Sequence, residues 1–167
     1  PSEFNSSRKI ILPGVGHYDK CIQNLKRINL FNDLKNKIFS DNYFFLGICV
    51  GMQILFQSSE EGTEEGLGFF KGNVNKFNFE NNFKTPHMGW NNLIFDNKKN
   101  ILNLDNRVYF CHSYYVQCDD SDDIVASTIH GKKFPSIVCK KKVYGFQFHP
   151  EKSYNDGETL IKNFLDL

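Results

Sequence analysis

The sequence predicts an α/β fold, in which a sheet is flanked by helices and carries an antiparallel excursion in its second half. Strand-like and helix-like segments alternate over residues 8–59, as in folds joined by right-handed crossovers. The run at 43–48 is apolar throughout, which is typical of a strand covered on both faces. Short strand-like runs separated by turn residues follow, and a helix closes the sequence.

The first predicted strand is "RKIIL", residues 8–12, which is rich in β-branched residues. The "PGVG" at 13–16 interrupts it. A helix is predicted over 19–39, where apolar side chains recur every three or four residues, with Asp19 as its N-cap.

The apolar strand at 43–48 leads into a second predicted helix at 51–59. After "EEGTEEGLG" the pattern changes to short strands separated by turns. These strands are predicted at 73–79, 92–95, 107–111, 114–118, 124–130, 136–140 and 143–148, and the closing helix at 157–167.

The composition is that of an ordinary globular domain. A length of 167 residues fits one domain with a sizeable core. The net charge of +1 gives no electrostatic reason to expect nucleic acid or an anionic membrane as a partner. No apolar run approaches the roughly 18 to 20 residues of a membrane span, and no signal peptide is visible. Five Cys residues without a CxxC pair favour reduced thiols and a cytoplasmic location.

The stretch "GICVG", residues 47–51, is the first candidate for chemistry. It has the form of the nucleophile elbow G-x-S-x-G, with Cys49 in place of serine. A tight strand-to-helix turn strains the nucleophile, and the flanking glycines leave room for that turn. The predicted helix would favour the thiolate, and the Val50 N–H would face a developing oxyanion. An isolated cysteine is more commonly an inert buried residue, but this context favours a nucleophile.

A thiol nucleophile needs a base, and His149 is the best candidate among the five histidines. It ends a strand-like run, with Pro150 next and Glu151 two residues on. At strand-like spacing the side chains of His149 and Glu151 share a face, so Glu151 would orient the imidazole and stabilise its charged form. Alone, "HPE" equally fits a surface turn. Together with the elbow, it predicts a Cys49–His149–Glu151 triad.

The glycines of "PGVG" do not fit a dinucleotide-binding loop, because the third glycine of G-x-G-x-x-G would fall on Asp19. The backbone of Gly14, Val15 and Gly16 would instead supply a second oxyanion donor. No HExxH, CxxC pair or EF-hand loop indicates a metal, and "CDDSDD" at 118–123 fits a solvated loop better than a cation site. We therefore predict no metal and no cofactor.

Two motifs, "PHMGWN" at 86–91 and "CHSYYV" at 111–116, are dense in histidine and aromatic residues. Both fit a turn with core aromatics. Alternatively, the single tryptophan, Trp90, is an interface anchor.

Taken together, "LGICVGMQ" and "FQFHPEKS" resemble the motifs of class I (triad) glutamine amidotransferases. More narrowly, "LPGVGHYDKCIQNL", "GLGFFKGNV", "PHMGWN", "HSYYV" and "YGFQFHPEKSYNDGETLIKNFL" are similar to the glutaminase subunits of imidazole glycerol phosphate synthases. The matches cover almost the whole sequence in the family's order. The resemblance implies a flavodoxin-like sheet and a single type 1 glutamine amidotransferase domain over residues 1–167.

The resemblance also implies residue roles. Cys49 would attack the side-chain amide of glutamine to form a γ-glutamyl thioester, while His149 acts as general base and acid. Glu151 would orient His149. The oxyanion hole would comprise Val50 and the strand Gly14, Val15 and Gly16. Glutamine would be held by Gln53, Glu61, Ser113 and Tyr114, and the partner interface would include Trp90, Asn91 and Lys152.

The implied partner is a (β/α)8 cyclase subunit, which forms a heterodimer with the glutaminase. Ammonia would pass through that barrel to a site that makes imidazole glycerol phosphate and an aminoimidazole carboxamide ribotide (AICAR) in histidine biosynthesis. The isolated subunit is expected to have low activity, because the family's oxyanion strand rests in an inactive orientation.

One departure from the family concerns the N-terminus. The family opens with a strand–helix–strand unit carrying a Y-G-x-G-N type motif, which is not found here, and the two methionines are Met52 and Met88. We therefore expect the domain to be N-terminally incomplete.

Two alternatives share this fold. The same glutaminase chemistry would serve an amidino-sugar synthase for surface polysaccharide. A non-catalytic interaction subunit is a further alternative, which the presence of all three triad residues argues against. An unrelated peptidase-type hydrolase would make the matches to glutamine-binding positions accidental.

Overall fold

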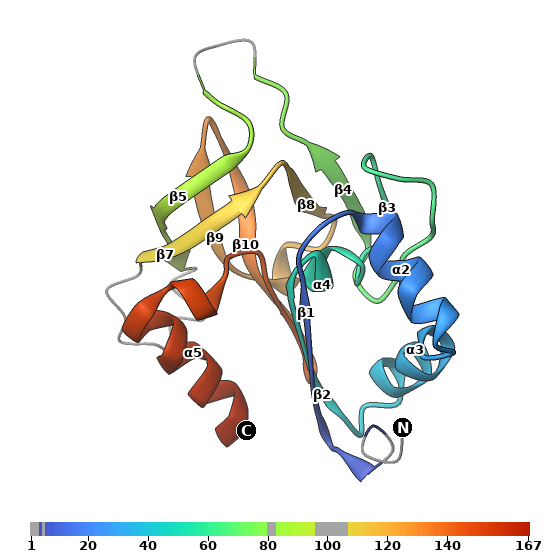
Figure 1. Cartoon of the computed structure of the whole chain (residues 1–167). Helices are drawn as coiled ribbons and strands as arrows, with labels where there is room; N and C mark the ends of the chain where they lie inside the picture. Colours follow the sequence, from blue (N-terminus) through green and yellow to red (C-terminus); the bar gives the residue numbers. More distant parts are fainter. Residues whose placement is uncertain (1–3, 5, 80–82, 96–106) are drawn as a thin grey trace.

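The computed structural model describes residue 4 and residues 6–79, 83–95 and 107–167. Its largest sheet, among the described residues, has six strands in the order β1-β2-β11-β10-β9-β6 (Figure 1). In one half, β1 (Lys9–Gly14), β2 (Phe44–Cys49) and β11 (Val143–Phe146) run parallel. In the other half, β10 (Lys132–Lys140), β9 (Ile124–His130) and β6 (Ile94–Phe95) are antiparallel. The predicted α/β fold with an antiparallel excursion is confirmed.

Two smaller sheets lie beside this one. One joins β3 (Ser58–Ser59), β4 (Gly72–Lys76) and β8 (Tyr114–Cys118), and the other pairs β5 (His87–Asn92) with β7 (Arg107–His112). The motif "PHMGWN" is therefore mainly a strand rather than a turn. It is held in register by six cross-strand pairs, from His87↔His112 to Asn92↔Arg107.

Helices flank the parallel half of the sheet. In Figure 1, α2 (Tyr18–Arg27) and α3 (Phe31–Phe39) lie on one side of β1 and β2, and α5 (Tyr154–Asp166) lies on the other. Strand β2 is buried on both faces, as predicted, with Phe45 and Leu46 fully covered. No helix in the described ranges is long and apolar enough to cross a membrane.

The helix predicted over 19–39 is interrupted. The chain breaks between α2 and α3 at Asn29, whose φ of 58° is incompatible with a continuous right-handed helix. The N-cap is His17 rather than Asp19, because His17 Nδ1 accepts a hydrogen bond from the Asp19 N–H. Asp19 instead lies in the first helical turn, where its carboxylate is used in a tertiary contact described below.

The helix predicted over 51–59 is mostly wrong. Helix α4 (Val50–Gln53) stops after four residues. The carbonyls of Ile54, Leu55 and Phe56 accept hydrogen bonds from the loop at 67–69, at 2.7 to 3.2 Å, so they are not available to a helix. Tertiary pairing has overridden local helix propensity. Two 3-10 turns, η1 (Ser121–Asp123) and η2 (Pro150–Lys152), complete the described elements.

Candidate active site

Cys49 lies at a sharp turn where β2 ends and α4 begins. Its φ of 54° and ψ of −111° are strained for a residue with a side chain. A Cβ added to Gly47 would lie 2.3 Å from the Gly51 carbonyl oxygen, and one added to Gly51 would lie 2.1 Å from the Leu12 carbonyl oxygen. Both glycines are therefore required by the close approach of backbones at this elbow.

The end of β1 is packed against the same turn. The register of β1 and β2 pairs Gly14 with Cys49, and a Cβ on Gly14 would lie 2.8 Å from the Gly51 nitrogen. The chain then leaves the sheet. Val15 is 84% exposed, and Gly16 has a φ of 112°, a conformation that favours glycine. The "PGVG" stretch therefore borders the Cys49 turn.

The Cys49 thiol is held in its neutral form. Burial raises the pKa of Cys49 to about 12, and the hydrogen bond from the Val50 backbone lowers that pKa only in part. Burial therefore opposes the expected stabilisation of the thiolate, and α4 is only a single turn, which limits what its dipole can add. A base must take the thiol proton when the sulfur attacks.

His149 is paired with Glu151: its Nδ1 lies 2.8 Å from Glu151 Oε1. The prediction that strand-like spacing brings the two side chains together is wrong. Instead, His149 directly precedes the 3-10 turn η2, which contains Glu151. The His149 backbone is anchored by its N–H, which donates to the Tyr109 carbonyl at 2.8 Å. The His149 carbonyl also accepts from Ser153 Oγ at 2.6 Å. The His149 backbone is thus held by β7 and by the start of α5, and the residue is 4% exposed.

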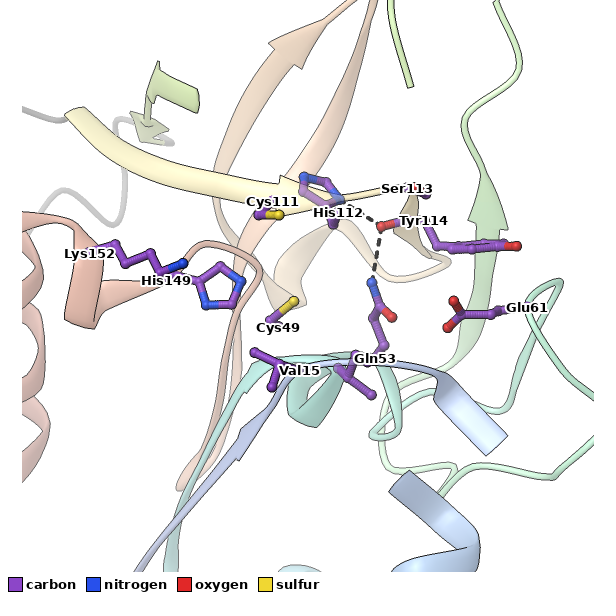
Figure 2. A pocket seen from close by; sticks show the side chains of 12 residues that line it. Val15, Cys49, Gln53, Glu61, Cys111, His112, Ser113, Tyr114, His149 and Lys152 are labelled. Carbon is purple, nitrogen blue, oxygen red and sulfur yellow. Dashed lines mark hydrogen bonds between the residues drawn. The ribbon is translucent and has the colours of Figure 1, made fainter. Parts of the chain in front are cut away.

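Cys49 and His149 line one cavity of about 180 Å³ (Figure 2). Most predicted site residues also line it, and the complete set is Val15, Gly16, Cys49, Val50, Gln53, Glu61, Cys111, His112, Ser113, Tyr114, His149 and Lys152. The cavity does not include Gly14, Glu151, Trp90 or Asn91. Gly14 abuts the elbow, Glu151 lies beyond His149, and the other two lie on β5.

Gln53 and Glu61 lie on the side of the cavity opposite His149 in Figure 2. Gln53 Nε2 donates to the Tyr114 carbonyl at 3.0 Å, and the Gln53 carbonyl oxygen lies on the side of Glu61. Glu61 Oε2 accepts from the Tyr18 N–H at 2.8 Å. A carboxylate and an amide oxygen that line the same cavity provide two acceptors for a cationic group such as an ammonium.

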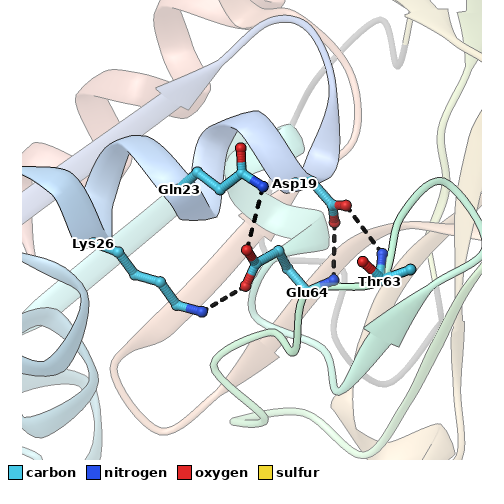
Figure 3. A network of polar contacts seen from close by, with 5 residues as sticks. All are labelled: Asp19, Gln23, Lys26, Thr63 and Glu64. Atoms are coloured by element: carbon cyan, nitrogen blue, oxygen red, sulfur yellow. Dashed lines mark hydrogen bonds and ion pairs between the residues drawn. The ribbon is translucent and has the colours of Figure 1, made fainter.

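The loop that carries Glu61 is fastened to α2 (Figure 3). The Asp19 carboxylate accepts from the N–H groups of Thr63 and Glu64, both at 3.0 Å. These bonds lower the pKa of Asp19, the contact with Thr63 most. Glu64 in turn pairs with Lys26 at 2.5 Å and accepts from Gln23 at 3.3 Å. A Cβ on Gly62 would lie 1.9 Å from Asp19 Oδ1, so a side chain there would displace this carboxylate.

An aromatic cluster lies beside the cavity. The Trp90 ring stacks on Tyr154, with centroids 5.2 Å apart, and meets Tyr109 edge-on at 6.0 Å. Lys152 Nζ lies 5.6 Å from the centre of the Tyr109 ring. Tyr154 is 80% exposed and Met88 on the same strand as Trp90 is 61% exposed. This aromatic surface joins two of the predicted interface positions, Trp90 and Lys152.

Sequence reasoning missed three residues of the site: Gln147, Cys111 and His112. Gln147 Nε2 donates to Cys49 Sγ at 3.8 Å, while Cys111 and His112 line the cavity. Alternation along "RVYFCH" would have placed His112 on the same buried face as Phe110. Gln147 could also have been recognised as a site candidate, because it is a polar residue between two phenylalanines at the end of a predicted strand. In the described ranges, no three His, Cys, Asp or Glu residues gather in a way that would hold a metal ion.

Comparison with known proteins is consistent with this geometry. The family model described as "Glutamine amidotransferase class-I" matches residues 2–167. An imidazole glycerol phosphate synthase subunit HisH 2 from Methanococcus maripaludis is 44% identical over 99% of this chain and 83% of its own length. The HisH subunit from Leptospira interrogans is 43% identical over 99% of this chain and 84% of its own length.

A solved glutamine amidotransferase structure shares the fold, with a TM-score of 0.72 at 18% identity over 95% of this chain and 78% of that one. The family match covers nearly the whole sequence, and both HisH relatives are matched over most of their length. The chain therefore belongs to the class-I glutamine amidotransferase family and, within it, groups with the HisH subunits of imidazole glycerol phosphate synthase.

Proposed function

We propose that this chain hydrolyses glutamine to glutamate and ammonia through Cys49, His149 and Glu151. The observation that carries the proposal is the strained Cys49 elbow, which shares a cavity with a histidine hydrogen-bonded to a carboxylate at 2.8 Å. This arrangement matches the nucleophile, base and orienting group of a hydrolytic triad. We propose that residues 1–167 form a single glutamine amidotransferase domain.

In the first half-reaction, Cys49 Sγ attacks the side-chain carbonyl carbon of glutamine and its proton passes to His149. The Glu151 carboxylate stabilises the imidazolium. His149 then gives the proton to the leaving nitrogen, which departs as ammonia and leaves a γ-glutamyl thioester. In the second half-reaction, His149 takes a proton from water, whose hydroxide adds to the thioester and releases glutamate and the Cys49 thiol.

The developing oxyanion is stabilised by the Val50 N–H and by the backbone of Gly14, Val15 and Gly16. The Val50 N–H already donates toward the Cys49 sulfur, so it lies close to the reacting atom. The α-ammonium group of glutamine is bound by the acceptors of Gln53 and Glu61, and its carboxylate end lies near Ser113 and Tyr114. These four residues all line the cavity.

The ammonia serves a (β/α)8 cyclase subunit that makes imidazole glycerol phosphate and AICAR. The names of the relatives favour this partner over an amidino-sugar synthase. The aromatic surface around Trp90, together with Asn91 and Lys152, is the face that the partner covers. Exposed aromatic residues beside a lysine are typical of an interface core with a charged rim.

The direct test compares two nitrogen sources in the assembled synthase. The Cys49→Ala variant is expected to lose product formation from glutamine, while added ammonium still supports product formation at the rate of the unsubstituted complex. Glutamine-dependent product at the unsubstituted rate would refute the proposal. Ammonium serves as the internal control, because it bypasses the glutaminase and reports on assembly.

A second measurement addresses the resting state. The isolated chain is expected to hydrolyse glutamine slowly, because the oxyanion strand of Gly14, Val15 and Gly16 is expected to rest in an inactive orientation. Steady-state ammonia release is measured with and without the barrel subunit. Equal rates would contradict a partner-dependent glutaminase.

A further inference from the structure

We propose that His87, His112 and Gln147 are positioning residues of the glutaminase site, joined in one hydrogen-bond chain that fixes the orientation of the Gln53 amide. The inference rests on the proposed function, because it assigns Gln53 to substrate binding. His87 and Gln147 do not line the cavity, and none of the three belongs to the predicted triad.

The outer half of the chain runs from β5 to β8. Asn91 Nδ2 lies 3.1 Å from His87 Nε2, and His87 Nδ1 lies 3.0 Å from His112 Nε2. His112 Nδ1 lies 2.7 Å from the Tyr114 carbonyl oxygen. The two histidines face each other directly across the β5–β7 pair.

The inner half runs from Tyr114 to the nucleophile. The Tyr114 carbonyl accepts a second hydrogen bond, from Gln53 Nε2 at 3.0 Å. Gln53 Nε2 also donates to Gln147 Oε1 at 3.1 Å, and Gln147 Nε2 donates to Cys49 Sγ at 3.8 Å. Figure 2 shows the bonds of His112 and Gln53 meeting at the Tyr114 oxygen. A continuous series of hydrogen bonds therefore joins Asn91 to Cys49.

The direction of each bond in the outer half is determined by the groups at its two ends. Asn91 Oδ1 accepts from the Asn92 N–H at 2.8 Å and Asn91 Nδ2 donates to the Ile129 carbonyl at 2.9 Å, so the amide cannot be reversed. Its second N–H must donate to His87 Nε2. His87 then carries its proton on Nδ1 and donates to His112 Nε2. His112 likewise carries its proton on Nδ1 and donates to the Tyr114 carbonyl.

Only neutral imidazoles fit this pattern, because each ring must donate through one nitrogen and accept through the other. The surroundings favour that state. His87 is 4% exposed and His112 is 6% exposed. The His87 ring is sandwiched between Phe110 at 4.6 Å and His130 at 4.1 Å. Burial lowers the pKa of His87 to about 4 and that of His112 to about 3.

The consequence for the substrate follows at Gln53. Both of its N–H hydrogens are used, by the Tyr114 carbonyl and by Gln147 Oε1. The amide therefore presents its oxygen, rather than its nitrogen, on the side of Glu61. An oxygen there accepts from the α-ammonium of glutamine, whereas a reversed amide would repel it. The chain thus makes the site selective for an amide substrate that carries an ammonium group.

The first arm of the test does not depend on activity. The protein is labelled with ¹⁵N in its histidine rings, and the nitrogen chemical shifts assign each tautomer. His87 and His112 are both expected as neutral Nδ1–H tautomers at neutral pH. A neutral Nε2–H tautomer or an imidazolium at either position would overturn the hydrogen-bond chain, whatever the enzyme does.

The second arm measures selectivity in the complex with the synthase subunit. The substrates are glutamine and glutaramate, which is glutamine without its α-amino group. In His112→Phe the ratio of their kcat/KM values is expected to fall about tenfold, because the Tyr114 carbonyl loses the donor that holds it toward Gln53 Nε2 and the Gln53 amide is then less firmly oriented. His87→Phe should lower the ratio in the same direction by less. His130→Phe is the matched control. The His130 ring stacks on His87, but its Nε2 donates to the Lys84 carbonyl, which does not belong to the hydrogen-bond chain.

The outcomes separate the two proposals. A ratio within twofold of the unsubstituted value in folded His112→Phe and His87→Phe would overturn the positioning role. If His112→Phe does not fold, His87→Phe and the tautomers of the unsubstituted protein still decide. Absence of glutamine hydrolysis by the unsubstituted complex would overturn the proposed function and, with it, the role of the hydrogen-bond chain in substrate binding. The measured tautomers would still test the hydrogen bonds themselves.

Discussion

The cavity has two walls that are built by different physics. The elbow wall, formed by β1, β2 and α4, is held by backbones that approach closely through Gly14, Gly47 and Gly51. The histidine wall, formed by β7 and β8 with β5 paired behind them, is held by hydrogen bonds between the side chains of His87 and His112 and the Tyr114 carbonyl. In the first wall a side chain at any of these three glycines would meet backbone atoms, whereas in the second wall single hydrogen bonds can be removed by substitution. Catalytic power is expected to depend on the elbow wall and substrate selectivity on the histidine wall.

The largest expected effect is the removal of the base beside the elbow wall. His149→Ala should lower kcat for glutamine by about 10²- to 10⁴-fold, because no group then takes the Cys49 proton. Glutamine-dependent turnover in the assembled complex provides the measurement, with ammonium-dependent turnover as the control. A loss of less than about tenfold, below the usual range for general base catalysis, would mean that another group serves as base.

The second-largest expected effect is a loss of stability caused by a side chain in the elbow wall. Gly51→Ala should reduce the free energy of unfolding by about 3 kcal/mol or more, since its Cβ would lie 2.1 Å from the Leu12 carbonyl oxygen. Gly68→Ala is the control. Gly68 has open space around it, so a side chain there is strained only by its φ of 67° and not by a clash. Urea unfolding compares the two. Equal losses would show that close packing at the elbow is not what requires glycine.

The histidine wall should respond to pH instead. His87 and His112 have lower pKa values in the folded protein than in the unfolded chain, which therefore binds protons that the folded state excludes. Stability is fully present above about pH 6.5 and falls as the pH drops toward 4, by up to about 1.4 kcal/mol per pH unit for each histidine. Urea unfolding between pH 7 and pH 5 should show a shallower slope for the His87→Phe/His112→Phe double variant than for the unsubstituted protein. Identical slopes would contradict neutral burial of these rings.

The smallest expected effect concerns the loop between the walls. Asp19→Asn removes one of two carboxylate oxygens that hold Thr63 and Glu64, so the loop bearing Glu61 should loosen. KM for glutamine is expected to rise about fivefold, with kcat nearly unchanged. Glu64→Gln leaves the Asp19 bonds in place and breaks only the pair with Lys26, so it should change KM by less than twofold. A similar KM rise in both variants would remove Asp19 from this role.

The elbow wall could largely be predicted from the sequence because its determinants are neighbours in the chain. Two glycines around Cys49 and the apolar strand before them are visible within ten residues. His149 and Glu151 are equally local, although the reason expected for their pairing was wrong: a 3-10 turn, not a strand, brings them together. Local patterns also indicated the α/β sheet.

The histidine wall could not be predicted, because its contacts join distant residues. His87 and His112 lie 25 positions apart, and Gln147 lies 98 positions from Cys49. Their motifs fitted core aromatics equally well until pairing of β5 with β7 brought the rings together. The same cause explains the short α4, whose continuation was lost to hydrogen bonds from a loop more than ten residues away. The pKa of Cys49 likewise reflects burial by the whole fold.

In the proposed mechanism Cys49 carries the glutamyl group during turnover. The most direct measurement is acid quenching of the complex during glutamine turnover, followed by mass spectrometry of the peptide that contains Cys49. A γ-glutamyl adduct on Cys49 is expected to accumulate in the unsubstituted protein and to be absent in Cys49→Ala. Steady ammonia release with no adduct on Cys49, or with the adduct on Cys111 in the same cavity, would contradict it.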